Sequence, residues 1–62
     1  KLLSVLDRLE ENHRSVLIMR YVEDFSPREI ANILSEKPNV ISVRIHRAIK
    51  QLRSILNNNE TA

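Results

Sequence analysis

The 62-residue chain contains no glycine. Tight β-hairpins need residues with positive φ, which glycine usually supplies, and the β-branched and aromatic runs that form strands are also missing. Aromatic residues make up 3% of the chain, against 42% apolar and 29% charged residues. This composition predicts one small all-α domain and nearly excludes sheet-rich folds. A domain near sixty residues buries only about 60% of its unfolded surface, so we expect a thin core.

The composition also argues against most catalytic chemistry. The chain has no cysteine and no glycine-rich phosphate loop, and its two imidazoles, His13 and His46, are too few for a recognisable metal site or nucleophile and base pair. We therefore expect no enzyme activity, no metal and no cofactor. No window reaches the roughly 18 apolar residues of a membrane span and no signal peptide is visible, so we expect a cytoplasmic protein. Because the chain starts at Lys1 rather than methionine, we expect it to be a piece of a longer protein.

Charge is distributed unevenly along the chain. Residues 1–36 include seven acidic and five basic residues, whereas residues 37–59 include five basic residues and no acid. A basic C-terminal part behind an acidic front half is typical of a surface that binds a polyanion such as nucleic acid. The alternative is a solvated helix face, with lysine and arginine favoured near its C-terminal end by the helix dipole.

Apolar periodicity and punctuation predict four helices, over about residues 2–9, 12–23, 27–35 and 38–56, followed by a disordered tail over 57–62. The second helix is apolar on nearly every side, which predicts that it forms the centre of the core. The alternative is that part of its surface contacts another protein. The two aromatic residues, Tyr21 and Phe25, are expected in the core rather than as platforms for base stacking.

The third helix has the clearest start signal in the chain. Ser26 stands at the N-cap, Pro27 at the first helical position and Glu29 at N3, which together predict a capping box. Pro38 suits the first position of the next helix. Two helices joined by about three residues must cross at a steep angle, so the sequence predicts a helix-turn-helix.

The last predicted helix has two different sides. At 3.6 residues per turn, an apolar stripe falls within a sector of roughly 80° and consists of Ile41, Ile45, Ala48, Leu52 and Ile55. The opposite side carries Asn39, Val43, His46, Arg47, Lys50 and Arg53, and the stripe is flanked by Ser42 and Arg44. We expect the stripe to face the core and the opposite side to face outward.

Three stretches of the chain, residues 14–23, 26–34 and 44–53, follow one another with the spacing of a known family. Residues 9–56 resemble region four of bacterial RNA polymerase sigma factors of the main superfamily, in particular those of the short extracytoplasmic-function type. Each stretch is degenerate alone, but the ordered set is hard to obtain by chance.

The resemblance implies a small four-helix domain of the helix-turn-helix class without a wing, acting in transcription initiation. Such a domain docks on the flap of the RNA polymerase beta subunit and places its last helix in the major groove of the promoter's minus-thirty-five element. By resemblance, the helix from Pro38 is the recognition helix, and the helix from Pro27 crosses the DNA backbone, where Arg28 meets a phosphate. An anti-sigma factor is a further partner that the resemblance allows.

The chain departs from the family pattern around the turn. Ser35 stands where a glycine usually ends the first helix of the pair, and a left-handed serine there costs about 1 kcal/mol relative to glycine. Glu36 stands where an apolar residue usually packs into the core, and Lys37 where a serine or threonine cap is common.

The base-reading positions implied by the resemblance hold few arginines. Hydrogen bonds from Asn39 and Ser42, contact of Val43 with a thymine methyl or with a protein partner, and the forked donors of Arg44 or Arg47 make a modest set. We therefore expect weak DNA binding by the domain alone, with the polymerase acting as a tether.

Other residues have two interpretations each. Arg47 and Lys50 are the expected phosphate partners, with a solvated surface charge as the alternative, and Lys37 belongs to the same candidate set. Arg44 either contacts DNA or pairs with an acid of the third helix such as Glu29, and His46 is a surface residue or a base reader. Arg14 and Arg20 lie six residues apart on one helix, so at most one of them faces DNA and the other braces the rim of the core.

Two other functions fit parts of the pattern. A LuxR-type response-regulator domain has a similar four-helix shape, although residues 46–48 and 51–53 look more like the sigma pattern. The second alternative is a protein-interaction domain that kept the fold and lost sequence-specific DNA reading, for example one held by an anti-sigma factor.

Overall fold

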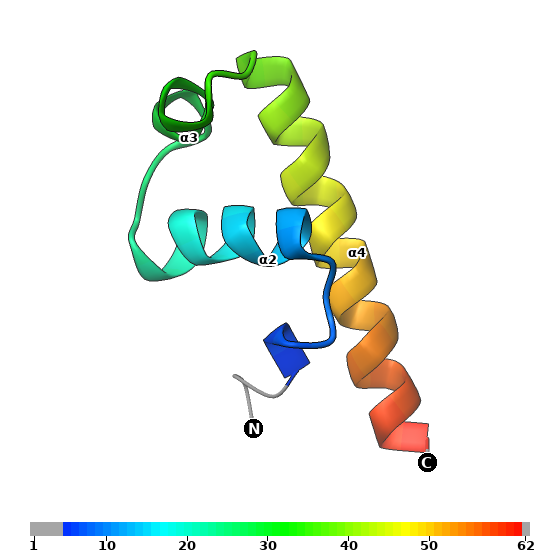
Figure 1. Ribbon diagram of the computed structural model, residues 1–62. Coiled ribbons are helices and arrows are strands. Elements are labelled where there is room, and N and C mark those ends of the chain that lie inside the picture. Colours follow the sequence, from blue (N-terminus) through cyan, green and yellow to red (C-terminus); the bar gives the residue numbers. More distant parts are fainter. Residues whose placement is uncertain (1–4, 62) are drawn as a thin grey trace.

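The computed structural model describes residues 5–61, and side chains as far as Asn57. Its elements are all helical: the helix α2 (Glu11–Leu17), the π-helix η1 (Ile18–Val22), α3 (Pro27–Leu34) and α4 (Pro38–Thr61). In Figure 1, α2 crosses the middle of α4, and α3 is seen end-on near the beginning of α4. The described part of the chain holds no strand, in agreement with the predicted all-α fold.

Before α2, the structure describes a single helical turn. Val5 and Leu6 are helical, and the backbone N–H groups of Arg8 and Leu9 donate to the carbonyls of Val5 and Leu6 at 3.0 and 3.1 Å. Residues 2–4 of the helix predicted over 2–9 lie outside the described residues. Within the described part, the helix is already replaced by a turn at Asp7, so it ends earlier than predicted.

The predicted helix over 12–23 is present from Glu11 to Val22, but its second half is wound as a π-helix. The N–H of Glu23 donates to the carbonyl of Ile18 at 2.9 Å, five residues back, and the N–H of Phe25 reaches the carbonyl of Met19 at 2.9 Å. Asp24 then ends the segment with φ of 64°, a left-handed conformation that aspartate tolerates better than most residues. The apolar periodicity does not signal this change of winding. π-Segments are also rare, so the sequence offers no reason to expect one here.

The capping box predicted at the start of α3 is confirmed. The N–H of Glu29 donates to the Ser26 hydroxyl at 3.1 Å, and the N–H of Ser26 donates to the Glu29 carboxylate at 2.8 Å. Because the bond from Ser26 stabilises the charged carboxylate, the pKa of Glu29 lies below its usual range.

The other end of α3 closes with two backbone bonds around a left-handed serine. Ser35 has φ of 58° and ψ of 43°. The N–H of Glu36 donates to the carbonyl of Ala31 at 2.8 Å, and the N–H of Ser35 to the carbonyl of Asn32 at 3.3 Å, which is the Schellman pattern. The chain therefore turns sharply at the predicted place, although glycine is absent there.

The helix α4 begins at Pro38 as predicted, and the N–H of Ile41 donates to the carbonyl of Lys37 at 3.1 Å. Its C-terminal end differs from the prediction: the helix continues to Thr61, so the disordered tail predicted over 57–62 is wrong as far as Thr61, and Ala62 lies outside the described residues. The three consecutive asparagines, Asn57 to Asn59, lower helix propensity only slightly. No proline or glycine stops the helix, so each added residue gains a backbone hydrogen bond.

The core lies where α2, α3 and α4 meet. Val16, Ile30, Ile41 and Ala48 are fully buried, and the core cluster is completed by Leu6, Leu9, Leu17, Ala31 and Ile45. The predicted stripe of α4 faces this core, with Leu52 and Ile55 partly buried at its distal end.

The predictions for the two aromatic residues have different outcomes. Phe25 is half-buried and packs against the core, but Tyr21 is 62% exposed, so its assignment to the core is wrong. Tyr21 lies in the π-helix together with Val22, which is 70% exposed. The second predicted helix therefore lies in the centre of the core only over its first half. In its second half, the partly buried Ile18 and Met19 pack against the core.

The left-handed serine gives a first testable prediction. Replacing Ser35 by glycine removes the clash that a Cβ suffers in the left-handed region, so we expect Ser35→Gly to stabilise the domain by about 1 kcal/mol. For a domain of this size that corresponds to a rise in Tm of about 4–8 °C, measured by circular dichroism. The matched control is Ser54→Gly in the exposed middle of α4, which should lower Tm slightly. Equal Tm changes in both variants would contradict the prediction.

The capping box gives a second prediction, on pH. Because folding lowers the pKa of Glu29, its stabilising effect is complete at neutral pH and is lost as the pH falls below about 4.3, the ordinary value for glutamate. We expect the Tm difference between the wild type and Glu29→Gln to be largest at pH 7 and to shrink at lower pH. A difference in Tm that stayed constant from pH 7 to pH 3 would contradict this account.

Candidate DNA-binding surface

The side of α4 that points away from the core is polar and basic. Of the seven predicted site residues in this helix, all but Arg44 are exposed: Asn39, Ser42, Val43, His46, Arg47 and Lys50. Because Ile41, Ile45 and Ala48 bury the opposite side of the same helix, α4 presents these residues as one continuous surface. We call this set of six residues the outer face of α4.

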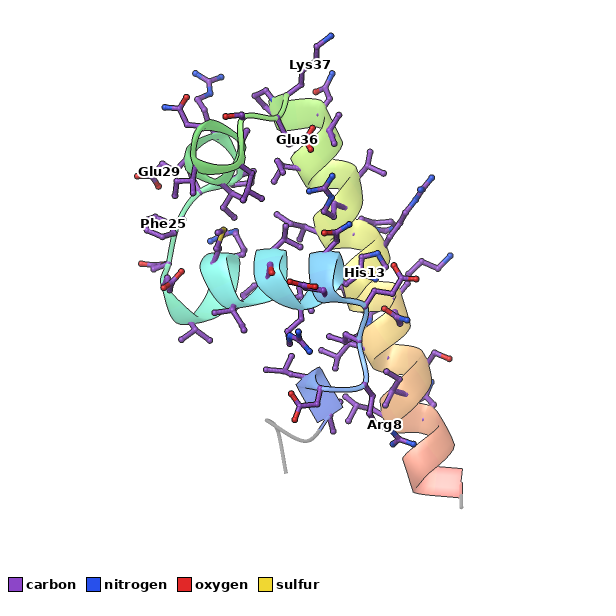
Figure 2. The ribbon with its side chains drawn as sticks, viewed as in Figure 1. Arg8, His13, Phe25, Glu29, Glu36 and Lys37 are labelled. Carbon is purple, nitrogen blue, oxygen red and sulfur yellow. The ribbon has the colours of Figure 1, made fainter. Side chains whose placement is uncertain are left out.

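The remaining predicted site residues lie outside this face. Lys37 is exposed in the turn before α4, and Figure 2 shows its side chain pointing away from the molecule beside the first turn of that helix. Arg28 is exposed on the first turn of α3, about one length of α3 away from the turn that leads into α4. The structure therefore places Lys37 next to the outer face and Arg28 at a separate position.

Arg44 is the predicted site residue whose side chain is partly buried and bound to another residue of the chain. Its Nη2 atom lies 3.4 Å from the Oε2 atom of Glu36, and only 22% of its side chain is exposed. Arg44 does pair with an acid, but the predicted partner, an acid of the third helix such as Glu29, is wrong. The acid is Glu36 of the turn, and the Glu29 carboxylate accepts from Ser26 at the start of α3. Figure 2 shows Glu36 directed toward the first turns of α4.

Beside the outer face lies a shallow concavity that the sequence did not predict. It is lined from α4 by Val40, Val43, Arg44 and Arg47, and from the beginning of α2 by Glu10, Asn12 and His13. His13 also ties the two helices together, because its Nδ1 atom lies 2.6 Å from the Oε1 atom of Gln51. The two residues are 38 positions apart in the chain, so no local pattern could reveal the contact.

Two arginines of the α2 to η1 segment brace the protein itself. The Nη1 atom of Arg20 donates to the carbonyl of Phe25 at 3.4 Å, and its guanidinium lies 5.5 Å from the centre of the Tyr21 ring. The Nη1 atom of Arg14 lies 3.9 Å from the Oδ1 atom of Asp7, whose side chain is 79% exposed. As predicted, one of the two arginines, Arg20, braces the rim of the core.

Arg53 extends the basic surface beyond the predicted set. It is exposed and lines a second shallow depression together with Lys50, Ser54 and Asn57. The helical repeat predicts Arg53 on the outward side of α4. Because α4 is longer than predicted, this outward side continues along the helix as far as Asn57. Among the described residues of α4 up to Asn57, the charged side chains are all basic.

A different kind of surface lies on another flank of α4. A groove with an almost entirely apolar wall is lined by Leu6, Leu17, Ile18, Tyr21, Val22, Ile49 and Leu52. It shares no residue with the outer face. The π-helix contributes three wall residues, Ile18, Tyr21 and Val22, of which Tyr21 and Val22 are the most exposed of the wall.

Within residues 5–61 no three histidines, cysteines or carboxylates gather as metal ligands, and no helix is long and apolar enough to cross a membrane.

Comparison with known proteins places the chain in a family. Residues 1–52 match the family described as sigma-70, region 4. The chain is also 38% identical, over 48 residues, to the RNA polymerase sigma factor SigV of Bacillus subtilis (strain 168). This match covers 77% of the chain and 29% of SigV, so the chain spans less than a third of the relative that it resembles.

Proposed function

The chain belongs to the sigma-70 region 4 family, and on that premise we propose that it is a promoter-recognition module that binds DNA through the outer face of α4. In this proposal α4 enters the major groove of the minus-thirty-five element, and α3 crosses the DNA backbone. The module acts by binding and positioning, in the cytoplasm, without covalent chemistry. Family membership also disfavours a LuxR-type regulator.

The observation that carries the proposal is the two-sided burial of α4. Its apolar stripe is fixed in the core, and its outer face presents polar and basic side chains with no acid as far as Asn57. A helix about 10–12 Å in diameter fits the major groove, which is about 12 Å wide. The rigid seat in the core therefore holds the outer face in one orientation toward a duplex.

The residues of the outer face divide into two roles. Arg47 and Lys50 bind phosphates, as do Lys37 in the turn and Arg28 on α3. Asn39 and Ser42 offer hydrogen bonds to base edges, and Val43, which is 49% exposed, offers an apolar contact to a thymine methyl. His46 is exposed between these two groups.

The dependence of binding on salt tests the proposal. With about three to five phosphate contacts, log affinity for a promoter duplex should fall against log salt with a slope of roughly −3 to −5. Fluorescence anisotropy with a labelled duplex at several salt concentrations measures this slope. A flat line would contradict the proposal and favour a protein-interaction domain, for example one held by an anti-sigma factor.

Two substitutions separate phosphate binding from base reading. Arg47→Ala should weaken binding to all duplexes alike, whereas Asn39→Ala should cost about 1–3 kcal/mol on the preferred sequence only. Competition between promoter and scrambled duplexes measures the ratio of the two affinities. If Asn39→Ala left this ratio unchanged, α4 would not be placed in the groove as proposed.

We further propose that the apolar groove docks the module on RNA polymerase, with an apolar segment of the flap of the beta subunit as its occupant. The relative SigV is an RNA polymerase sigma factor. The groove shares no residue with the outer face, so a duplex bound to that face leaves the groove open. Nearly all of its wall is apolar, so an occupant gains free energy mainly by removing apolar surface from water.

A pair of matched substitutions tests the docking site. Val22→Asp places a charge at the exposed edge of the groove and should weaken co-purification with core polymerase at least about tenfold, with DNA binding unchanged. Val43→Asp places the same charge on the outer face and should weaken DNA binding with docking unchanged. Docking that survives Val22→Asp would move the polymerase contact to another surface.

A further inference from the structure

The turn between α3 and α4 carries an acid at the edge of the basic surface. Glu36 follows the left-handed Ser35 directly, at the position that in a Schellman turn usually holds an apolar residue in contact with the helix. It is the last acidic residue before Glu60. Its side chain is 39% exposed and its carboxylate reaches Arg44 at 3.4 Å.

Arg44 in turn lies next to the DNA-binding residues. It lines the same concavity as Val43 and Arg47, which belong to the outer face. Arg44 and Arg47 are three residues apart on α4, so their side chains are neighbours and their like charges repel each other. In the absence of DNA, the carboxylate of Glu36 offsets this repulsion at Arg44. Glu10 is a second acid on the wall of the same concavity.

We propose that Glu36 is an internal stand-in for a DNA phosphate, which occupies Arg44 and lowers the affinity of this domain for duplex DNA. The inference rests on the proposed function of the outer face. A phosphate that approaches Arg44 must displace the carboxylate, and the carboxylate itself repels the backbone near the turn. The exposed ion pair is weak enough to be exchanged. Glu36 thereby lowers the affinity of the free domain for duplex DNA.

The experiment measures duplex affinity and its salt slope for Glu36→Gln in the whole 62-residue chain. Releasing Arg44 adds one phosphate contact, so the slope should steepen by about 0.9 and affinity should rise about 5- to 10-fold near 0.1 M salt. The matched control is Glu23→Gln, which removes the same charge at an exposed position beyond η1. This control should change affinity less than about 2-fold, because Glu23 follows η1, at the end of the α2 and η1 segment that lies farther from α4 (Figure 1), and salt screens distant charges.

Arg44→Gln completes the test. In the wild-type background this variant should change affinity less than about 2-fold, because Arg44 is already occupied, whereas in the Glu36→Gln background it should abolish the gain. This non-additivity distinguishes the release of Arg44 from a general change of charge. Circular dichroism of every variant checks that the helices are retained. If Glu36→Gln unfolds the chain, Glu36→Ala takes its place, alone and combined with Arg44→Gln, with the same expected gain and the same loss of that gain.

The outcomes separate the two levels of the proposal. Salt-dependent binding by the wild type, with equal effects of Glu36→Gln and Glu23→Gln, would overturn the role of Glu36 and leave the proposed function intact. Weaker binding by Glu36→Gln would also overturn it, because Glu36 would then position Arg44 for DNA. A flat salt dependence for every variant would overturn the proposed function and this inference together.

Discussion

The sharp turn at Ser35 is the constraint on which the arrangement of the other surfaces depends. Two backbone hydrogen bonds close α3 around this left-handed serine, and Pro38 starts α4 three residues later. The turn brings Ile30 of α3 and Ile41 of α4 into one core cluster, in which both are fully buried. Once Ile41 is fixed, the helical repeat determines which side of α4 faces outward. The orientation of the outer face is therefore a consequence of how the short helix α3 and the long helix α4 meet.

Two surfaces of different chemistry lie around the one long helix α4. The outer face of α4 is polar and basic, while the apolar groove lies on another flank and is lined mainly by α2, η1 and Ile49 and Leu52 of α4. The π-helix contributes to this division, because it carries Tyr21 and Val22 out of the core to the edge of the groove. A thin core is compatible with this design, since α4 connects both surfaces rigidly.

Side chains outside the core fix the positions of the charged groups. The contact between His13 and Gln51 holds the beginning of α2 against α4, and Glu36 holds Arg44 on the flank of α4. Arg20 closes the loop after the π-helix by binding the carbonyl of Phe25. These contacts are exposed or half-buried, so each adds little to the stability of the fold. Two of them engage the guanidinium groups of Arg44 and Arg20, which a ligand would otherwise meet free. The basic surface is therefore smaller than the count of arginines suggests.

The sequence by itself determined the elements whose causes are local. Neighbouring residues and the helical repeat are enough to predict the capping box of Ser26 and Glu29, the start of α4 at Pro38 and the buried stripe of α4. The same holds for the free-energy cost of a left-handed backbone at Ser35. The tertiary structure decided the winding of η1, the exposure of Tyr21 and the choice of Glu36 as the partner of Arg44. Most of these outcomes depend on how segments distant in the chain pack together, and small differences in packing energy outweigh the weak local propensities from which a sequence pattern is read.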